Sequence, residues 1–576
     1  MDKPNVILVM TDDQGYADLG STGNPWLRTP EIDRFCEDSV RFADFHVSPL
    51  CTPTRGALMT GHRPARNGAW ATCWGRSILK KDEMTMADVF KENGYSTGMF
   101  GKWHLGDNYP YRPMDRGFDK VVAHKGGGVG QTPDFWGNNY FDDTYFVNGA
   151  PEDFAGYCTD VWFDQAEEFI KSCGDRPFFA YIATNAPHSP YLVEERYAAP
   201  YRDNEQVVHP EFYGMITNID ENFGRLRALL GKLGIEDNTI VMFMTDNGSS
   251  GGCTLDSDGF VARGYNAGMR GKKGSRYDGG HRALWFMRWP EAGLKGGGEI
   301  EEMSLHVDVL PTLIDVCGLK PPSNVEFDGV SLAPILRGER SQLECDRTHH
   351  IDLRQSTELP GIWDGCVMTR DWRLVHGEEL FNIKNDPGQQ CNVAREHPEV
   401  VAGLRRAQEE WWREISPRMK EYAYISLGAE AENPTRLDAM DVMGDVAWNQ
   451  VSIAAAKKSS GTWNVAIEKR GRYRFALRRW PQELDLPIDA GISRDAADRL
   501  APYGKGPYVP RTIHPVAATL KLFDCEYKLA VEPGMSEATI ELDLHQTGET
   551  RLDAWFFDEK NNAQGAYYVY VERIGM

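Results

Sequence analysis

Residues 5–15 read NVILVMTDDQG, an apolar run followed at once by an acidic pair. Seven mostly apolar residues with several β-branched side chains are typical of a strand buried on both faces. The run is too short to span a membrane. Asp12 and Asp13 would therefore lie where a buried strand ends, at the edge of a sheet where open α/β folds bind ligands.

Three later runs have the same character, at 96–100, 178–184 and 239–245. Segments with helical periodicity lie between them, such as 86–93 and 212–233. Strands that alternate with helices favour a mostly parallel central sheet covered by helices, so the fold class predicted from residue 5 to about residue 345 is α/β.

The remainder of the chain differs in pattern. Residues 376–388 suggest a strand and a turn, and 395–414 an amphipathic helix. After residue 430, short alternating segments punctuated by Gly or Pro predict an all-β, sandwich-like unit. We therefore expect an α/β domain at 1–345, a small α+β subdomain at 346–430 and an appended β domain at 431–576. The last could bind glycan, close a cleft, mediate oligomerisation or serve packing alone.

The composition restricts the partners. The 576 residues carry a net charge of −22, which argues against nucleic acid because phosphate binding needs a cationic surface. An anionic substrate would need a locally positive pocket. No membrane-spanning run occurs, so a membrane partner is not expected. The eleven cysteines form no Cys-x-x-Cys pair, which disfavours a disulfide framework or a zinc cluster. No signal peptide is visible, so we expect a cytoplasmic protein, or a periplasmic or secreted one if a leader has been removed.

Two polar turns predict a metal site. Asp12-Asp13 follows one predicted strand, and Asp246-Asn247 follows another. Such pairs converge on one cation when the strands are neighbours, and donors that are all oxygen favour Ca²⁺ or Mg²⁺ over Zn²⁺. Each motif alone is also an ordinary turn signal.

Cys51 lies in the stretch CTPTR, at 51–55. Thr52 is a good N-cap and Pro53 suits the first helical position, so Cys51 would lie just before a helix N-terminus. The partial positive charge there favours an anion, and Arg55, one turn later, could orient position 51. The alternative is a buried structural thiol.

CTPTR resembles the Cys-x-Pro-x-Arg signature of the type I, formylglycine-dependent sulfatases, whose fold is alkaline-phosphatase-like. Residues 101–106, GKWHLG, closely resemble a second motif of that family. The resemblance extends to about residue 430 and implies a sulfuric ester hydrolase in which Cys51 is converted to Cα-formylglycine by a maturation enzyme. One hydroxyl of the hydrated aldehyde then attacks sulfur, and the other expels sulfate.

The resemblance also implies roles for individual residues. Asp12, Asp13, Asp246 and Asn247 match the metal ligands, with the modified Cys51 as a further ligand and Ca²⁺ as the usual ion. Arg55 and Lys102 would contact the nucleophile and the sulfate, and His104 would deprotonate the hydrate. His188 would protonate the leaving alcohol, assisted by Lys273, for which Lys272 is the rival. Asp278 and His281 depart from the family pattern.

The substrate is less constrained by the sequence. Aromatic and polar residues in loops favour a sulfated carbohydrate, and five are candidate contacts: Trp74, Arg76, His124, Lys125 and Trp136. A phosphodiester or phosphonate hydrolase of the same superfamily and a glycan-binding pseudoenzyme are the alternatives. The sulfate position, exo or endo action and the oligomeric state stay open.

Overall fold

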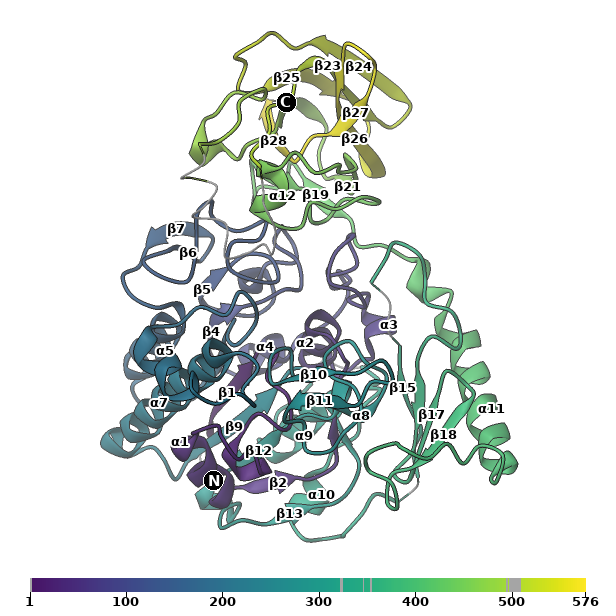
Figure 1. The fold of residues 1–576 in the computed structure, drawn as a ribbon. Helices are drawn as coiled ribbons and strands as arrows, with labels where there is room; N and C mark the ends of the chain where they lie inside the picture. The colour runs from purple at the N-terminus through teal and green to yellow at the C-terminus, as the bar shows by residue number, and fades with distance from the viewer. Residues whose placement is uncertain are drawn as a thin grey trace.

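The computed structural model describes residues 3–321, 325–344, 346–352, 355–493, 496 and 509–575. A ten-stranded sheet forms its centre, in the order β13-β2-β12-β9-β1-β8-β4-β5-β6-β7 (Figure 1). Its strands are β1 (Asn5–Thr11), β2 (Val40–Phe42), β4 (Ser96–Lys102), β5 (Lys120–His124), β6 (Thr144–Val147), β7 (Ala150–Asp153), β8 (Phe178–Ala183), β9 (Thr239–Thr245), β12 (Trp285–Arg288) and β13 (Glu299–Ile300).

The middle of this sheet is parallel. β1 pairs in parallel with both β8 and β9, and β4 pairs in parallel with β8 and β5. The strands toward the edges are mixed, since β12, β6 and β7 pair in antiparallel fashion. The predicted α/β class with a mostly parallel core is confirmed, and the antiparallel additions are what the sequence patterns did not reveal.

Helices cover both faces, and β1 shows how the sequence divides them. Val6, Leu8 and Met10 pack on one side, and Ile7 and Val9 on the other, because successive side chains of a strand point to opposite faces. The first face is covered by α2 (Cys51–Thr60), α4 (Met86–Glu92) and α9 (Val309–Val316). The second is covered by α1 (Pro30–Glu37), α5 (Cys158–Cys173) and α7 (Pro210–Leu233).

Shorter elements connect these layers. They are β3 (Phe45–His46), α3 (Pro64–Asn67), α6 (Glu195–Ala198), β10 (Cys253–Leu255), β11 (Val261–Gly264), α8 (Asp278–His281), β14 (Ser304–Leu305) and α10 (Ala333–Leu336). Single-turn 3₁₀ helices lie at Gly20–Thr22, Pro113–Asp115, Ala199–Tyr201, Pro290–Ala292, His306–Asp308, Arg418–Lys420 and Gln482–Leu484.

A second, four-stranded antiparallel sheet follows, packed with one long helix. Its strands are β15 (His349–Ile351), β16 (Cys366–Met368), β17 (Trp372–Val375) and β18 (Glu379–Asn382), and the helix is α11 (Pro398–Ile415). Leu404 of α11 packs against Val367, Leu374 and Leu380 of this sheet. This arrangement gives an α+β unit beside the central sheet (Figure 1).

The C-terminal part consists of two further sheets at the top of Figure 1. One has β19 (Ile425–Leu427), β21 (Thr462–Ile467), β26 (Gly548–Asp558), β23 (Pro515–Leu522), β24 (Cys525–Ala530) and β27 (Ala563–Gly565). The other has β20 (Thr435–Asp438), β28 (Tyr568–Gly575), β22 (Gly471–Arg478) and β25 (Ala538–Leu544), and α12 (Gln450–Ala454) lies beside them. β19 pairs with β21, so this β unit begins before residue 431. The boundaries of the three domains stay predictions.

Two observations concern the whole described chain. The ten cysteines that it contains are all free, and eight of them are buried. Within the same residues, every helix is either too short or too polar to cross a lipid bilayer.

Candidate active site

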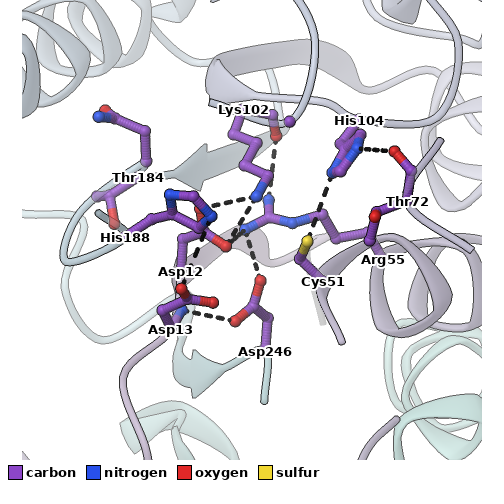
Figure 2. A network of polar contacts seen from close by, with 12 residues as sticks. Asp12, Asp13, Cys51, Arg55, Thr72, Lys102, His104, Thr184, His188 and Asp246 are labelled. Atoms are coloured by element: carbon purple, nitrogen blue, oxygen red, sulfur yellow. Dashed lines mark hydrogen bonds and ion pairs between the residues drawn. The ribbon is translucent and has the colours of Figure 1, made fainter. Parts of the chain in front are cut away.

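Four parallel strands bring the polar turns of the sequence to one edge of the central sheet. Asp12 and Asp13 follow β1, and Asp246 and Asn247 follow β9, whose last residue Thr245 pairs with Thr11. Lys102 ends β4, and His188 lies in the loop after β8. Because parallel strands end on the same side, these residues meet at the carboxyl edge of the sheet. Figure 2 shows Asp12, Asp13, Lys102, His188 and Asp246 together there, and Asn247 is hydrogen-bonded to Asp13.

Three buried carboxylates form the centre of the site. One oxygen each of Asp12, Asp13 and Asp246 lies within 4.8 Å of the others. The backbone N–H of Asp13 donates to Asp246 Oδ1 at 2.9 Å, which joins the two turns directly. Since all three side chains are removed from water, their charge must be balanced by nearby cations.

Three cationic side chains provide this balance. Lys102 Nζ lies 2.8 and 2.7 Å from the two oxygens of Asp12, and Lys273 Nζ lies 2.7 Å from Asp13 Oδ2. Arg55 donates to Asp246 Oδ2 at 3.0 Å, to the carbonyl oxygen of Lys102 at 3.1 Å and to Tyr181 Oη at 3.3 Å. The three cations therefore offset the three carboxylates, and a divalent ion held by the carboxylates would make the site locally positive, which is what an anionic substrate requires.

The donor set fits a hard divalent cation. The three carboxylates offer oxygen ligands, and Asn247 adds an amide oxygen that is buried without a hydrogen-bond donor among the described residues. A buried oxygen without a hydrogen-bond partner lowers the stability of the folded state unless a ligand contacts it. The amide nitrogen of Asn247 is held by Asp13 Oδ1 at 3.1 Å, which leaves the oxygen end of the side chain for a metal. Oxygen donors alone match Ca²⁺ or Mg²⁺.

The pKa values of two of these carboxylates are shifted in opposite directions. Burial opposes the ionisation of Asp13, but Lys273, His188 and Lys102 outweigh it and lower its pKa. Burial and the neighbouring charge of Asp12 raise the pKa of Asp246 to about 7, although Arg55 opposes this shift. Two acids packed this closely need a further positive charge to remain ionised together, and a divalent ion would supply it.

Cys51 occupies the first turn of α2. The structure corrects the predicted cap: Leu50 is the N-cap, without a side-chain cap bond, and Cys51 is already helical. Thr52 does not cap, since its hydroxyl is buried without a partner among the described residues. Thr54 instead stabilises the entry, by hydrogen bonds with the backbone N–H and carbonyl of Ser48 at 3.1 and 3.0 Å.

His104 is oriented toward Cys51. Its Nδ1 lies 3.5 Å from Cys51 Sγ, and its Nε2 lies 3.1 Å from the carbonyl oxygen of Thr72 (Figure 2). A carbonyl can only accept, so Nε2 carries the proton and Nδ1 presents its lone pair to residue 51. Burial and Lys102 hold the pKa of His104 well below its ordinary value, which keeps the ring neutral.

His188 and Lys273 lie on the other side of the carboxylates. His188 Nε2 is 3.7 Å from Asp13 Oδ2, and its Nδ1 contacts the carbonyl oxygen of Ser189 at 2.6 Å. Of the two candidate lysines, Lys273 reaches the site, whereas Lys272 Nζ points to the carbonyl oxygen of Cys253 at 3.2 Å. Gly274, which follows Lys273, has a φ of +79°, a backbone conformation that favours glycine.

A cavity of about 570 Å³ opens above these groups. Cys51, His104, His188 and Lys273 lie at its base, and Trp74, Gln131 and Gln355 contribute to its sides. Further lining residues come from the C-terminal β unit: Met440, Gly444, Asp445, Val446, Trp448 and Lys457. Its size falls within the roughly 300–1,000 Å³ typical of small-molecule sites.

The predicted substrate contacts are mostly elsewhere. Of the five, Trp74 lines the cavity. Arg76 is buried with its guanidinium over the ring of Tyr422, and His124 and Lys125 line a separate small pocket. Trp136 packs edge-on against Trp480. Sequence reasoning missed Gln131, Trp448 and Lys457, which carry no local motif, because only tertiary packing brings them to the cavity.

The two residues that depart from the family pattern belong to a buried network behind the site. Asp278 Oδ1 accepts a hydrogen bond from Arg373 Nε at 3.0 Å, and His281 Nδ1 lies 3.0 Å from His46 Nδ1. Arg373 is fully buried and also lies 3.8 Å from Asp44. Arg373 lowers the pKa of Asp278 to about 2 against the effect of burial. These side chains therefore hold the loop that carries Lys273 rather than contact the cavity.

This network predicts a stability effect. Asp278→Ala leaves the buried Arg373 guanidinium without its nearest carboxylate. This lowers the free energy of unfolding by about 3–5 kcal/mol. We expect the thermal midpoint to fall by more than about 5 °C in calorimetry or near-ultraviolet circular dichroism. Asp258→Ala, on an exposed loop, is the matched control and should unfold as the native protein does. An unchanged midpoint for Asp278→Ala would show that the pair contributes little.

Comparisons with known proteins agree with one another. Residues 4–319 match the family model described as Sulfatase. The chain is 31% identical to arylsulfatase A of Homo sapiens, over 70% of this chain and 87% of the relative, and 29% identical to N-acetylgalactosamine-6-sulfatase of Mus musculus, over 68% and 77%. Among solved structures, Ps i-CgsB in complex with k-i-k-neocarrahexaose is 26% identical, with a TM-score of 0.64 over 73% of this chain and 95% of that one.

Proposed function

Because this chain belongs to the sulfatase family, whose members are sulfuric ester hydrolases, we propose that it removes sulfate from a carbohydrate at the cavity above Cys51. The observation that carries the proposal is the convergence of four polar turns and Cys51 at one sheet edge, with three cations around three carboxylates. Two relatives support a sugar substrate, since one is named for N-acetylgalactosamine and another is complexed with neocarrahexaose.

Asp12, Asp13, Asp246 and Asn247 would hold Ca²⁺, with Mg²⁺ as the alternative. When bound, the ion supplies Lewis-acid polarisation of an oxygen and offsets the charge that develops on sulfate. The protein's contribution is to fix the four side chains. The direct hydrogen bond from Asp13 to Asp246 and the bond from Asn247 to Asp13 keep the two turns at a constant separation.

Residue 51 would supply the nucleophile after oxidation to formylglycine, and its Sγ marks where the aldehyde oxygen stands. Burial raises the pKa of the Cys51 thiol despite Lys102 and Lys273, so the unmodified side chain is a poor nucleophile near neutral pH. This supports a need for oxidation, and with it a maturation enzyme as partner. Arg55, held at Asp246 and at the Lys102 carbonyl, keeps the first turn of α2 against the metal ligands.

The histidines would move protons on opposite sides of the reacting group. His104 Nδ1, with its lone pair toward residue 51, is placed to remove a proton from an oxygen there. His188, beside Lys273 at the other side, would deliver a proton to the departing alcohol from Nε2 when both ring nitrogens are protonated, since Nδ1 donates to the carbonyl oxygen of Ser189. Lys102 and Lys273 stabilise negative charge on the sulfuryl oxygens, since both ammonium groups already face the anionic centre.

The test begins with the chemistry at position 51. Mass spectrometry of the peptide that contains Cys51 should show loss of sulfur and gain of an aldehyde when a maturation enzyme is co-expressed. The purified protein should then release sulfate from 4-nitrocatechol sulfate and from sulfated saccharides far faster than phosphate from 4-nitrophenyl phosphate. A preference for the phosphate ester would overturn the proposal in favour of a phosphoester hydrolase.

The two adjacent lysines provide a matched pair of variants. Lys273→Ala removes the ammonium group that contacts Asp13 and faces the cavity, so we expect kcat/KM to fall by about 10²–10³-fold. Lys272→Ala removes only a contact with the Cys253 carbonyl and should stay within about threefold of the native value. Steady-state kinetics with 4-nitrocatechol sulfate measure both, and the reverse ranking would assign the role to Lys272.

A further inference from the structure

One wall of the cavity comes from the appended β unit, beyond the 4–319 segment that matches the family model. This wall, the 440–457 wall, consists of Met440, Gly444, Asp445, Val446, Trp448 and Lys457. It faces a base that contains Cys51, His104 and His188. A substrate that fills this cavity therefore meets side chains that the catalytic sheet does not provide.

Trp448 is the most informative residue of the 440–457 wall. Its side chain is 39% exposed, and it is the one exposed tryptophan among the residues that the structure describes. A large aromatic ring left open to solvent inside a cavity is costly unless it meets a ligand. The apolar face of a sugar ring is such a ligand, because its C–H groups pack flat against an aromatic ring.

The backbone of Trp448 is held firmly against the catalytic domain. Its carbonyl oxygen accepts from the N–H of Thr132 at 3.1 Å, and Asn449 forms an antiparallel bridge with Gln131. Gln450 donates to the carbonyl oxygens of Gln131 and Phe135 at 3.3 and 3.0 Å. The backbone of Trp448 is therefore fixed before a ligand arrives, which limits the ordering cost of binding to the side chain.

Trp74, which also lines the cavity, is tied to the same wall. Trp74 Nε1 donates to the carbonyl oxygen of Gly444 at 3.0 Å, and the N–H of Trp74 donates to the carbonyl oxygen of Met440 at 3.1 Å. Both bonds join the catalytic domain to the β unit. Trp74 and Trp448 both line the cavity, so two parts of the chain form it together.

Lys457 adds a positive charge to the 440–457 wall. Its backbone is fixed, since its N–H donates to the carbonyl oxygen of Ser452 at 2.8 Å and its carbonyl oxygen accepts a hydrogen bond from Tyr567 Oη at 2.6 Å. Its ammonium group forms no ion pair within the described residues, whereas the adjacent Lys458 pairs with Asp445 at 3.4 Å. In a protein with a net charge of −22, an unneutralised lysine on a cavity wall attracts an anion.

We propose that Trp448 and Lys457 form a second saccharide subsite, which binds the sugar next to the one that loses sulfate. Trp448 stacks on the ring of that neighbouring sugar, and Lys457 pairs with its sulfate or carboxylate group. The preferred substrate is then an anionic oligosaccharide rather than a monosaccharide or an aryl sulfate. This inference rests on the proposed function and deepens it, because it assigns a task to the appended β unit.

The kinetic test compares substrates of different length. Tetrasaccharides of chondroitin 6-sulfate, κ-carrageenan and heparin are assayed separately, beside 4-nitrocatechol sulfate. For the tetrasaccharide hydrolysed fastest, Trp448→Ala should lower kcat/KM by about tenfold or more, and Trp448→Phe should retain most of it. Lys457→Gln should lower it several-fold, with the loss shrinking as salt rises. Both alanine and glutamine variants should hydrolyse 4-nitrocatechol sulfate as the native enzyme does. Lys560→Gln, at an exposed turn outside the cavity, is the matched control.

A binding measurement separates the two levels of the proposal. Calorimetric titration of Cys51→Ala with each tetrasaccharide needs no turnover, so it tests the subsite even if sulfate is never released. Adding Trp448→Ala to that variant should weaken binding by about tenfold. Equal affinity of the two variants, or no binding of any of the three tetrasaccharides, would overturn the subsite. In the kinetic test, so would a loss of kcat/KM on 4-nitrocatechol sulfate equal to the loss on the tetrasaccharide. Failure of the modified native enzyme to release sulfate from any of these esters would overturn the proposed function instead.

Discussion

Cys51→Ala is expected to lower sulfate release by at least about 10³-fold, because it removes the side chain from which the nucleophile is made. The protein should still fold. Alanine is a better helix former than cysteine, and residue 51 begins a helix, so only the packing of one sulfur atom is lost. The measurement is kcat/KM with 4-nitrocatechol sulfate, together with a thermal melt that should shift by no more than a few degrees.

Cys73 provides the matched control for this substitution. It lines the same cavity and is buried, and burial raises the pKa of its thiol to about 12. It lacks the helical position and the histidine contact of Cys51, so Cys73→Ala should keep activity within a few-fold. Near-native activity of Cys51→Ala would refute the role of residue 51, and equal loss in both variants would indicate a general effect of cavity packing.

The second large effect concerns the oxygen ligands. Asp13→Asn keeps the shape of the side chain but removes a charge from the set that would hold the cation, so we expect kcat to fall by about 10²-fold or more. The same variant should lose the thermal stabilisation that Ca²⁺ gives the native protein, since an ion that binds only the folded state raises its stability by mass action. Differential scanning fluorimetry with Ca²⁺ after treatment with EGTA reads this without any turnover.

Ion selectivity and a control complete the test. Donors that are all oxygen predict stabilisation by Ca²⁺ or Mg²⁺ at concentrations where Zn²⁺ has no specific effect. Asp258→Asn, on an exposed loop away from the three carboxylates, should respond to Ca²⁺ as the native protein does. Stabilisation of Asp13→Asn equal to that of the native protein would place the cation elsewhere, or show that Asp13 does not hold it.

The site shows which parts of such a protein local sequence can predict. The apolar run of β1 and the acidic pair after it identify a strand end, and the run before Asp246 identifies another. Since parallel strands end at one edge, the alternation of strands and helices predicts that these turns share an edge, and the pairing of β1 with β9 then brings them together. The sequence favoured Lys273 and kept Lys272 as the rival, because a difference of one residue in a loop turns a side chain away from the site; in the structure Lys273 contacts Asp13 and Lys272 contacts the Cys253 carbonyl.

Other features depended on distant packing. Thr52 looked like the helix cap, but Thr54 bonds the backbone of Ser48 and the helix begins at Cys51. Arg76, a predicted substrate contact, is instead buried over the ring of Tyr422. In each case the local preference was real, and a contact with another segment outweighed it because caps and loop contacts contribute only about 1 kcal/mol each.

The amino-acid order by itself determined the α/β class, the sulfatase resemblance and the identity of the residues that gather at the sheet edge, because strand ends, turns and short motifs are encoded by neighbouring residues. Only the tertiary structure decided which lysine contacts Asp13, and that Trp448 and Lys457 line the same cavity as Cys51. The physical reason is that a cavity wall is made by whichever surfaces bury one another in the folded chain. The bonds of Thr132 and Gln131 to the 447–450 segment achieve this, and no local pattern specifies that pairing.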